Sequence, residues 1–319
     1  MSDSSLQAKA VVFERPNALV LADLPLTAPG QNDVVVDVEF SGISTGTERL
    51  LWNGAMPSFP GLAYPLVPGY ETVGQIVDAG LDQRSRIGER VFVSGADCFG
   101  DVRGLFGGSA SRLVVPSEKA LRISTSVYDK GTLLALAATA LHAIRGAGHS
   151  AAPDLIIGHG VLGRLLARLS LAMTGVPPTV WEVDSGRFAG AQGYDVLRPE
   201  KDTRHDYQHI YDVSGDADIL DDLVKRIAPG GEIVLAGFYS KRLSFTFPPA
   251  FMREARFRIA AEWKRVDLRN AHRMVEDGAL SLDGLITHTV PASEASMAYD
   301  TAFGDPNCLK MVMDWRTLQ

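Results

Sequence analysis

The sequence predicts an α/β protein with two parts, an antiparallel barrel and a doubly wound parallel sheet. Short strands between Gly and Pro turns run from Ala8 to about Leu121, whereas strands and helices alternate from about Lys130 onward. A further apolar strand, Cys308–Trp315, closes the chain. Closely spaced strands favour an antiparallel barrel, and regular alternation of strand and helix is typical of a parallel sheet.

The barrel is predicted from alternating residue types. In Val34–Phe40, apolar residues alternate with Asp37 and Glu39, which is the period of a half-buried strand. Similar segments are Val73–Val77, Arg90–Val93 and Ser111–Val115. Because the closing strand can return to the barrel, we expect a discontinuous domain made of residues 1–121 and 266–319.

The parallel sheet is expected within residues 122–265. Its predicted strands are Leu155–Ile157, Val180–Val183, Ile210–Val213, Glu232–Ala236 and Phe257–Glu262. The predicted helices are Leu133–Ile144, Leu162–Met173, Ser185–Ala191 and Ile219–Ile227, with Leu268–Glu276 and Ser293–Phe303 following in the discontinuous domain. Such alternation implies a doubly wound fold.

Composition excludes several classes of protein. The chain has 319 residues and a formal net charge of −7, which argues against nucleic acid as a partner because phosphate-binding surfaces carry a basic excess. Two cysteines, Cys98 and Cys308, rule out a disulfide framework and fit a reducing compartment. The start, Met1–Leu6, lacks a secretory signal, and no apolar run reaches about 18 residues. We therefore expect a cytoplasmic protein without a transmembrane segment.

A glycine motif predicts a dinucleotide site. Gly158–Gly163 reads G-H-G-V-L-G and lies between the strand Leu155–Ile157 and a helix. Gly158 permits a tight turn, Gly160 lets the backbone approach a pyrophosphate, and Gly163 allows close packing of helix and strand. Backbone N–H groups and the helix dipole then hold the phosphates. The residues expected to bind the cofactor are Gly158, His159, Gly160, Val161, Leu162 and Gly163, with the His159 side chain as a spacer rather than a catalyst.

An acidic residue predicts which dinucleotide binds. Asp184 follows the strand Val180–Val183 and lies about 20 residues after Gly163, where a carboxylate accepts hydrogen bonds from the adenosine ribose. A carboxylate there repels a 2′-phosphate and favours NAD over NADP. Arg187 weakens this preference because it can neutralise a phosphate. Thr139 is a further candidate for cofactor binding.

The order of the two parts and two motifs resemble a known superfamily over nearly the whole chain. Gly69–Val77 is similar to the G-H-E-x-x-G-x-V segment of the medium-chain dehydrogenase/reductases, and Gly42–Ser44 to their G-I-C segment. The resemblance implies a GroES-like catalytic domain, an NAD-binding Rossmann domain and alcohol dehydrogenase activity. Ser44 and Tyr70 stand where zinc enzymes have Cys and His ligands, and Glu71 alone cannot hold zinc. We therefore expect an enzyme without a catalytic metal.

Four longer segments resemble one branch of this superfamily, the 3-hydroxyethyl bacteriochlorophyllide a dehydrogenases. They are Ser41–Trp52, Tyr64–Glu71, Val102–Gly108 and Leu133–Ala140. This resemblance implies NAD-dependent oxidation of a C3 1-hydroxyethyl group to acetyl in bacteriochlorophyll biosynthesis, a part of photosynthesis. It also implies a tetrapyrrole substrate and a place at the periphery of the photosynthetic membrane, and a homodimer is compatible with it.

Without a metal, the alcohol proton must pass to a positioned side chain. The catalytic candidates are Ser44, Thr47, Glu48, Tyr70 and Glu71. We expect Tyr70 or Ser44 to bond the substrate oxygen, and Glu48 or Glu71 to accept or orient the proton. The alternative roles are structural: Thr47 and Glu48 at a helix start, Glu71 as a supporting carboxylate and Tyr70 as a packing residue.

The substrate candidates lie in an apolar loop. Trp52, Met56 and Phe59 can line a cleft for a flat, largely apolar ring, and Arg49, Arg103 or Arg112 can pair with its carboxylates. Three rival interpretations stay open. They are another zinc-free medium-chain enzyme such as an NADPH-dependent quinone reductase, a zinc-dependent polyol dehydrogenase, and an NAD-binding sensor without activity.

Overall fold

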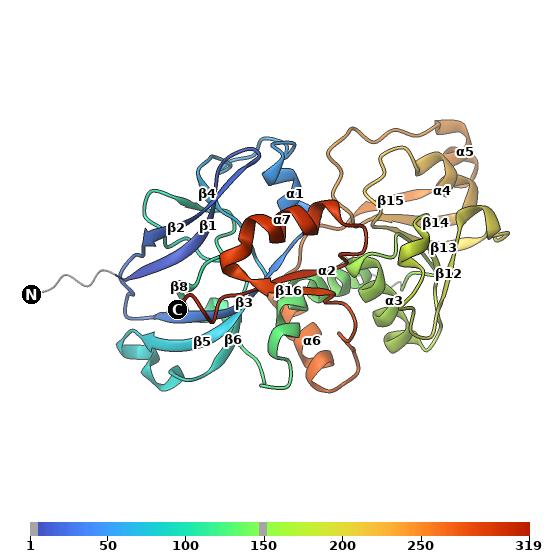
Figure 1. The fold of residues 1–319 in the computed structure, drawn as a ribbon. Helices are drawn as coiled ribbons and strands as arrows, with labels where there is room; N and C mark the ends of the chain where they lie inside the picture. Colours follow the sequence, from blue (N-terminus) through green and yellow to red (C-terminus); the bar gives the residue numbers. More distant parts are fainter. Residues whose placement is uncertain (1–5, 147–151) are drawn as a thin grey trace, which may run out of the picture. The chain divides into compact units, whose positions relative to one another are not determined.

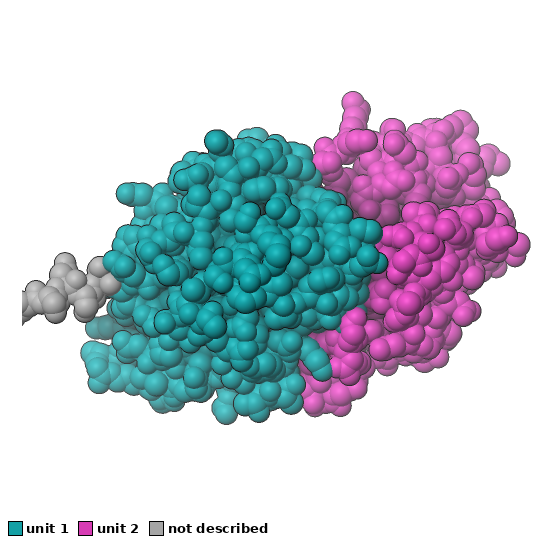
Figure 2. Space-filling model, in the orientation of Figure 1, with its two compact units in different colours: residues 1–135, 285–319 teal, residues 136–284 magenta. Residues whose placement is uncertain are grey.

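The structure is a computed structural model that describes residues 6–146 and 152–319. Most of the predicted start, Met1–Ser5, lies outside the described residues. The chain divides into two compact units, coloured separately in Figure 2. Unit 1 comprises Met1–Ala135 and Leu285–Gln319, and unit 2 comprises Leu136–Gly284. No helix among the described residues is long and apolar enough to cross a membrane.

Unit 1 is built from two mostly antiparallel sheets. The larger sheet contains β16 (His288–Pro291), β17 (Met311–Asp314), β3 (Asp33–Ile43), β5 (Thr72–Ala79), β6 (Arg90–Val93) and β9 (Ala120–Arg122) in that order, with β8 (Arg112–Pro116) also paired to β3. The smaller sheet has the order β2 (Ala18–Pro25), β1 (Gln7–Arg15), β4 (Leu66–Val67) and β7 (Arg103–Gly104). The alternation in β3 leaves Asp37 and Glu39 partly exposed and buries their neighbours Val36, Val38 and Phe40 in the core.

Short helices connect the strands of unit 1. They are α1 (Thr47–Trp52), the 3-10 turns Leu81–Arg86, Ser117–Lys119, Tyr128–Leu133 and Ala292–Glu294, and α7 (Ala295–Gly304). In Figure 1 the red C-terminal segment runs back among the blue N-terminal strands. There β17 pairs antiparallel with β3, with Met311 opposite Ile43 and Asp314 opposite Phe40. The predicted return of the closing strand to the barrel is therefore confirmed. The short strand β16, which the sequence analysis missed, pairs with β17 in parallel.

Unit 2 contains one parallel sheet. Its order is β12 (Asp195–Leu197), β11 (Thr179–Trp181), β10 (Leu155–Ile157), β13 (Tyr207–Asp212), β14 (Ile227–Leu235) and β15 (Arg256–Ile259). The chain therefore starts in the middle of the sheet, builds outward to one edge and returns to build the other half. This is the doubly wound order, and the predicted fold class is confirmed.

The helices of unit 2 are α2 (Leu134–Arg145), which begins at the end of unit 1, α3 (Val161–Thr174), α4 (Leu220–Arg226), α5 (Phe247–Met252) and α6 (Arg265–Glu276), with 3-10 turns at Ser185–Arg187 and Pro199–Lys201. The predicted helix Ser185–Ala191 is wrong, because only its first three residues form a 3-10 turn. The strand β12 and the helix α5 were not predicted. The strand has only three residues, and the helix has six, two of which are prolines, so neither segment shows a clear hydrophobic period.

The division into units lies later in the chain than the predicted domain boundaries at 121/122 and 265/266. Residues Tyr128–Leu133 pack on β3 and β5, so the first division follows them. Helix α6 is joined to α2 by a hydrogen bond of 2.8 Å between His142 Nδ1 and Asp267 Oδ2, so the second division follows α6. A short-range sequence pattern indicates where a helix or strand lies along the chain. The unit to which that helix or strand belongs depends on the elements against which it packs.

Candidate active site and cofactor-binding loop

The pairing of β3 with β5 brings Ser44 and Tyr70 together. Ser41 and Thr72 are opposite each other in the two strands, Ser44 directly follows the end of β3, and Tyr70 precedes β5. The Ser44 Oγ and the Tyr70 hydroxyl are 2.6 Å apart and share a hydrogen bond. The two side chains form a hydroxyl pair that can donate to and accept from an alcohol oxygen.

Glu48 fixes the turn that carries Ser44. Its carboxylate is fully buried, accepts the Ser44 backbone N–H through Oε1 at 2.9 Å, and accepts the Tyr299 hydroxyl through Oε2 at 2.7 Å. Burial raises the pKa of Glu48 to about 7, although both hydrogen bonds oppose this rise. Glu48 therefore gains or loses a proton near neutral pH, and each of its oxygens is already engaged by the protein.

Tyr70 is held as a neutral phenol. Burial, followed by the charge of Glu71, raises the pKa of Tyr70, while hydrogen bonds with Ser44 and Thr47 lower it. Its ring lies edge-on to that of Phe106, with ring centres 5.4 Å apart. Thr47 does not cap helix α1, since Gly46 is the N-cap and no side chain caps the helix there.

Glu71 forms a buried ion pair with Lys310. The Lys310 ammonium bonds Glu71 Oε2 and also donates to the Ile43 carbonyl at 3.0 Å. Burial raises the pKa of Glu71, and the ammonium of Lys310 lowers it. Among the described residues, Glu71 Oε1 is buried without a hydrogen-bond partner. This oxygen is therefore the one carboxylate position of the cluster that is free to accept a proton or a hydrogen bond.

Sequence reasoning missed Tyr299 and Lys310, which lie 251 and 239 residues from their partners Glu48 and Glu71. The only available signal was Lys310 itself, a single charged residue within the first half of the apolar strand predicted at Cys308–Trp315. Tyr299 gave no signal, because an aromatic residue in a helix ordinarily packs in a core.

The polar cluster does not fit a zinc ion. Ser44 and Tyr70 bond each other as neutral hydroxyls, and the ammonium of Lys310 engages Glu71. Zinc requires three or four deprotonated N, S or O ligands that converge on one point. Within the parts of the chain that the structure describes, no group of three or more His, Cys, Asp or Glu side chains can hold a metal.

The glycine loop in unit 2 has the form that a dinucleotide needs. Gly158 follows β10 with a φ of +99°, which favours glycine, and a Cβ on Gly163 would lie 1.9 Å from the Gly158 carbonyl oxygen. A Cβ on Gly160 would enter space with no atom within 4 Å. Gly160 is the N-cap of α3 and has no side-chain cap, so the first-turn N–H groups of Val161, Leu162 and Gly163 are left for an anion. These residues fit a diphosphate.

His159 lies inside unit 2. It is fully buried, with Nδ1 2.6 Å from the Arg187 carbonyl oxygen and Nε2 2.8 Å from the Tyr194 hydroxyl. Burial lowers the pKa of His159 to about 4, so the imidazole is neutral. Because a carbonyl oxygen only accepts, Nδ1 carries the proton and Nε2 accepts the hydroxyl. The ring thus joins the glycine loop to the segment after β11.

Asp184 and Arg187 lie in that segment and are close to each other. Asp184 Oδ1 accepts the Gly186 N–H at 2.9 Å, and its Oδ2 lies 3.8 Å from Arg187 Nε, with both side chains 39% exposed. Sequence reasoning missed Glu182, which directly follows β11 and is buried between this segment and the glycine loop. Thr139 lies partly buried on α2.

The predicted substrate residues separate into two groups. Trp52 ends α1 and packs on Phe13, with ring centres 5.4 Å apart, and Met56 packs on the core of unit 1. Phe59 is 37% exposed and remains available at the surface of unit 1.

The three candidate arginines also differ in their contacts. Arg112 is paired with Asp37 at 2.5 Å, and the guanidinium of Arg49 lies 5.8 Å from the centre of the Phe303 ring. Arg103 lies exposed in β7. Arg49 and Arg103 are therefore both exposed, whereas Arg112 is already paired with Asp37.

Comparisons with known proteins show the family and the fold of this chain. The model of the alcohol dehydrogenase GroES-like domain matches residues 30–125. Two relatives, both named 2-desacetyl-2-hydroxyethyl bacteriochlorophyllide A dehydrogenase, are 54% identical to this chain. The relative from Cereibacter sphaeroides aligns over 316 residues and the one from Rhodobacter capsulatus over 312, in each case 98% of this chain and 99% of the relative.

Solved structures share the whole fold. An alcohol dehydrogenase from Escherichia coli CFT073, complexed with NADH, has a TM-score of 0.83 at 22% identity over 97% of this chain and 99% of its own. A dehydrogenase from Sinorhizobium meliloti 1021, bound to NADP, has a TM-score of 0.82 at 21% identity over 97% and 99%. The chain is therefore a member of the medium-chain dehydrogenase/reductase superfamily and belongs, within it, to the family of the 2-desacetyl-2-hydroxyethyl bacteriochlorophyllide A dehydrogenases.

Proposed function

We propose that this protein oxidises the C3 1-hydroxyethyl group of a bacteriochlorophyllide to an acetyl group, with NAD⁺ as the cofactor and without a catalytic metal. The 54% identity to two relatives of that name, over nearly their whole length, carries the proposal of the substrate. The hydroxyl pair of Ser44 and Tyr70, which takes the place of two metal ligands, supports a metal-independent reaction.

The reaction removes a hydride from the carbinol carbon and a proton from its hydroxyl group. The glycine loop Gly158–Gly163 would hold NAD⁺, which would supply the acceptor for the hydride. The Ser44–Tyr70 pair binds and orients the alcohol oxygen, and Tyr70 acts as a neutral donor because its pKa is raised. The proton passes through this pair toward Glu71 or Glu48, whose charges both act on Tyr70. Proton transfer to a positioned side chain replaces the acidification that a metal supplies in zinc enzymes.

Each carboxyl group has one property that suits it to receive the proton. Glu71 presents the buried oxygen Oε1, which has no partner among the described residues. Glu48 has a pKa of about 7, which is close to the pH at which a general base is most effective. Its oxygens, however, already bond Ser44 and Tyr299. Geometry therefore favours Glu71 as the acceptor and Glu48 as the group that holds Ser44 in place.

The preference for NAD⁺ rests on Asp184. A carboxylate in the segment after β11 accepts hydrogen bonds from the ribose hydroxyls and repels a 2′-phosphate. The nearby Arg187 reduces that repulsion, and the relevant alternative is an NADPH-dependent reductase. Comparing binding of NADH and NADPH to the purified protein decides between them.

The direct test is an absorption scan of the hydroxyethyl pigment with enzyme and NAD⁺. An acetyl group extends the conjugation of the macrocycle, so the long-wavelength band should shift to the red as NADH appears.

Tyr70→Phe and Ser44→Ala should lower kcat by 10²-fold or more, the usual contribution of a positioned proton-transfer group, while NADH binding persists. Near-native turnover of both Tyr70→Phe and Glu48→Gln, with cofactor binding intact, would contradict the assignment. So would a stoichiometric zinc ion required for turnover.

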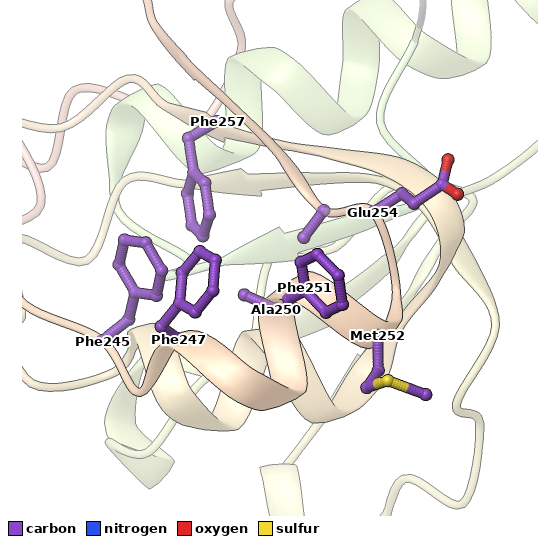
Figure 3. A pocket seen from close by; sticks show the side chains of 8 residues that line it. Phe245, Phe247, Ala250, Phe251, Met252, Glu254 and Phe257 are labelled. Carbon is purple, nitrogen blue, oxygen red and sulfur yellow. The ribbon is translucent and has the colours of Figure 1, made fainter.

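We also propose that the protein forms a homodimer through the β15 edge of unit 2. β15 ends its sheet and has a free side that an identical strand can extend about a two-fold axis. Beside it, Phe245, Phe247, Phe251 and Phe257 gather around one pocket (Figure 3). Phe251 and Met252 are 64% and 77% exposed there, which is unusual for side chains of this size.

Light scattering of the purified protein should give twice the mass of one chain, and Phe251→Glu should give the mass of one. A monomeric wild type would contradict the dimer.

In the cell we place the enzyme in the cytoplasm, at the periphery of the photosynthetic membrane, because an apolar chlorin partitions into lipid. Cell fractionation in low-salt buffer tests this location.

A further inference from the structure

We propose that Phe106 is a positioning residue for Tyr70, because its ring stands against the phenol ring and keeps the Tyr70 hydroxyl beside Ser44. This inference rests on the proposed role of the hydroxyl pair in alcohol oxidation. Phe106 follows β7 by two residues, and its side chain is partly buried. The ring planes of Phe106 and Tyr70 meet at 88°, with ring centres 5.4 Å apart. An edge-on contact of this kind is one of the arrangements that two aromatic rings prefer.

The hydroxyl of Tyr70 and its ring are held by different neighbours. The hydroxyl shares a hydrogen bond of 2.6 Å with Ser44 Oγ, and a hydrogen bond with Thr47 also acts on it. Rotation about the Cα–Cβ bond of Tyr70 would swing the whole ring and carry the hydroxyl away from both partners. Phe106 stands beside that ring and opposes the rotation on its side. The hydrogen bonds therefore act on the hydroxyl, and Phe106 acts on the ring that carries it.

The two kinds of contact differ once an alcohol binds. A substrate hydroxyl on the Ser44–Tyr70 pair takes up hydrogen-bonding capacity that the two residues otherwise use for each other. The contact between the Phe106 and Tyr70 rings involves no polar atom, so it stays unchanged while the proton moves. Phe106 is therefore a contact that can hold Tyr70 in place throughout the reaction.

The backbone of Phe106 is fixed against two residues that lie shortly after β6. The Ala96 N–H donates to the Phe106 carbonyl oxygen at 2.9 Å. The chains come so close here that a Cβ on Gly95 would lie 2.1 Å from the same oxygen, and a Cβ on Gly107 would lie 1.8 Å from the Ala96 carbonyl oxygen. Gly107 also has a φ of +79°, which favours glycine. Such a close approach leaves Phe106 little room to shift.

The residues after Phe106 are also bonded to the chain on both sides of Tyr70. The Gly108 N–H donates to the Gly69 carbonyl oxygen at 2.8 Å, and Gly69 directly precedes Tyr70. The Gly108 carbonyl oxygen accepts the Thr72 hydroxyl of β5 at 2.9 Å. One hydrogen-bonded frame therefore carries both rings. Replacing the Phe106 side chain should free the Tyr70 ring without moving its backbone.

The test is a double-mutant cycle of Phe106→Leu and Tyr70→Phe in the full-length enzyme. Phe106→Leu keeps an apolar side chain but loses the flat ring. Phe106→Met replaces it if the leucine variant fails to fold, since Met adapts to irregular gaps. The matched control is Tyr128→Leu, which removes a partly buried ring from another edge-on pair of unit 1, with the Phe40 ring centre 4.9 Å away. Single turnovers with enzyme in excess over the pigment measure the residual rate of Tyr70→Phe.

We expect Phe106→Leu to lower the rate of pigment oxidation about tenfold when the Tyr70 hydroxyl is present, which is close to the most that one edge-on aromatic contact supports. In Tyr70→Phe, which has no hydroxyl to position, the same substitution should lower the residual rate by less than about twofold. The KM for NAD⁺ and the KM for the pigment should stay near the wild-type values. Tyr128→Leu should lower the melting temperature and leave the rate unchanged.

Two results would overturn the inference. Equal loss of rate with and without the Tyr70 hydroxyl would show that Phe106 acts on the pigment or on the fold, and not through Tyr70. A folded Phe106→Leu enzyme with the wild-type rate would show that the ring is not needed. A wild type that does not oxidise the hydroxyethyl pigment with NAD⁺ would instead remove the proposed function, and this inference with it. That rate is measured before the cycle, so the two failures are told apart.

Discussion

The hydroxyl of Tyr299 donates a hydrogen bond of 2.7 Å to Oε2 of Glu48, although 251 residues separate the two in the chain. The other oxygen of the same carboxylate, Oε1, accepts a hydrogen bond from the backbone N–H of Ser44. The C-terminal part of unit 1 therefore supports the turn that carries the candidate catalytic serine.

The buried state of Glu48 predicts a pH-dependent stability. Burial raises its pKa from 4.5 to about 7, so the folded protein keeps a proton that the unfolded chain releases. Stability from this group is complete below pH 4.5 and is lost as the pH rises through 7. From pH 4.5 to pH 8, the wild type should lose about 3 kcal/mol of unfolding free energy relative to Glu48→Gln.

Urea denaturation of both proteins at each pH measures this difference. Tyr299→Phe provides a second check. It removes a hydrogen bond that lowers the pKa of Glu48, so the midpoint of the loss should move to higher pH. A difference between wild type and Glu48→Gln that does not change with pH would contradict the buried, titrating carboxyl group.

The Glu71–Lys310 pair predicts a strong and asymmetric effect on stability. Lys310→Met leaves a buried carboxylate without its ammonium, which ordinarily costs about 3–5 kcal/mol. Combining it with Glu71→Gln removes the uncompensated charge and should recover most of this loss. Thermal unfolding of the wild type, of each single variant and of the double variant measures the coupling. Additive effects would show that the two side chains do not interact.

The open space at Gly160 predicts a variant that folds but does not bind the cofactor. A Cβ there meets no atom of the protein, so Gly160→Ala should keep the wild-type melting temperature. The added methyl group enters the space proposed for the diphosphate and should weaken NADH binding about tenfold or more. Gly163→Ala is the contrast, because its Cβ would lie 1.9 Å from the Gly158 carbonyl oxygen and should disturb the fold as well. Fluorescence titration with NADH checks both, and normal affinity in Gly160→Ala would argue against the site.

Asp184 predicts how cofactor choice can be altered. Asp184→Ser removes the charge that repels a 2′-phosphate and leaves Arg187 beside the ribose position. We expect the ratio of kcat/KM for NADP⁺ to that for NAD⁺ to rise at least tenfold, or by about 1.4 kcal/mol. Arg187→Ala should move the ratio the other way. An unchanged ratio in both variants would place the adenosine ribose elsewhere.

Several features could be predicted because they repeat at short range. The alternation in Val34–Phe40 gave the strand β3, and the strand, glycines and helix around Gly158 gave the start of the parallel sheet. The apolar segment at the end of the chain gave the return strand β17. The two motifs that carry Ser44 and Tyr70 gave two candidate residues that the structure brings into contact. In each case a few neighbouring residues carry the whole signal.

The partners of those residues were decided by the fold. Strand pairing and helix packing in unit 1 bring Tyr299 to Glu48 and Lys310 to Glu71, and the parallel pairing of β10 with β11 brings the Glu182 carboxylate to the His159 N–H. The same packing turned Trp52 and Met56 toward the core rather than leaving the whole loop for substrate. A sequence pattern has the period of one strand or one helix, whereas a buried contact depends on the register of two segments far apart in the chain. The sequence alone therefore determined the strands and helices that have a clear period and the glycine loop between them, and the tertiary structure determined which charges and hydroxyls face one another.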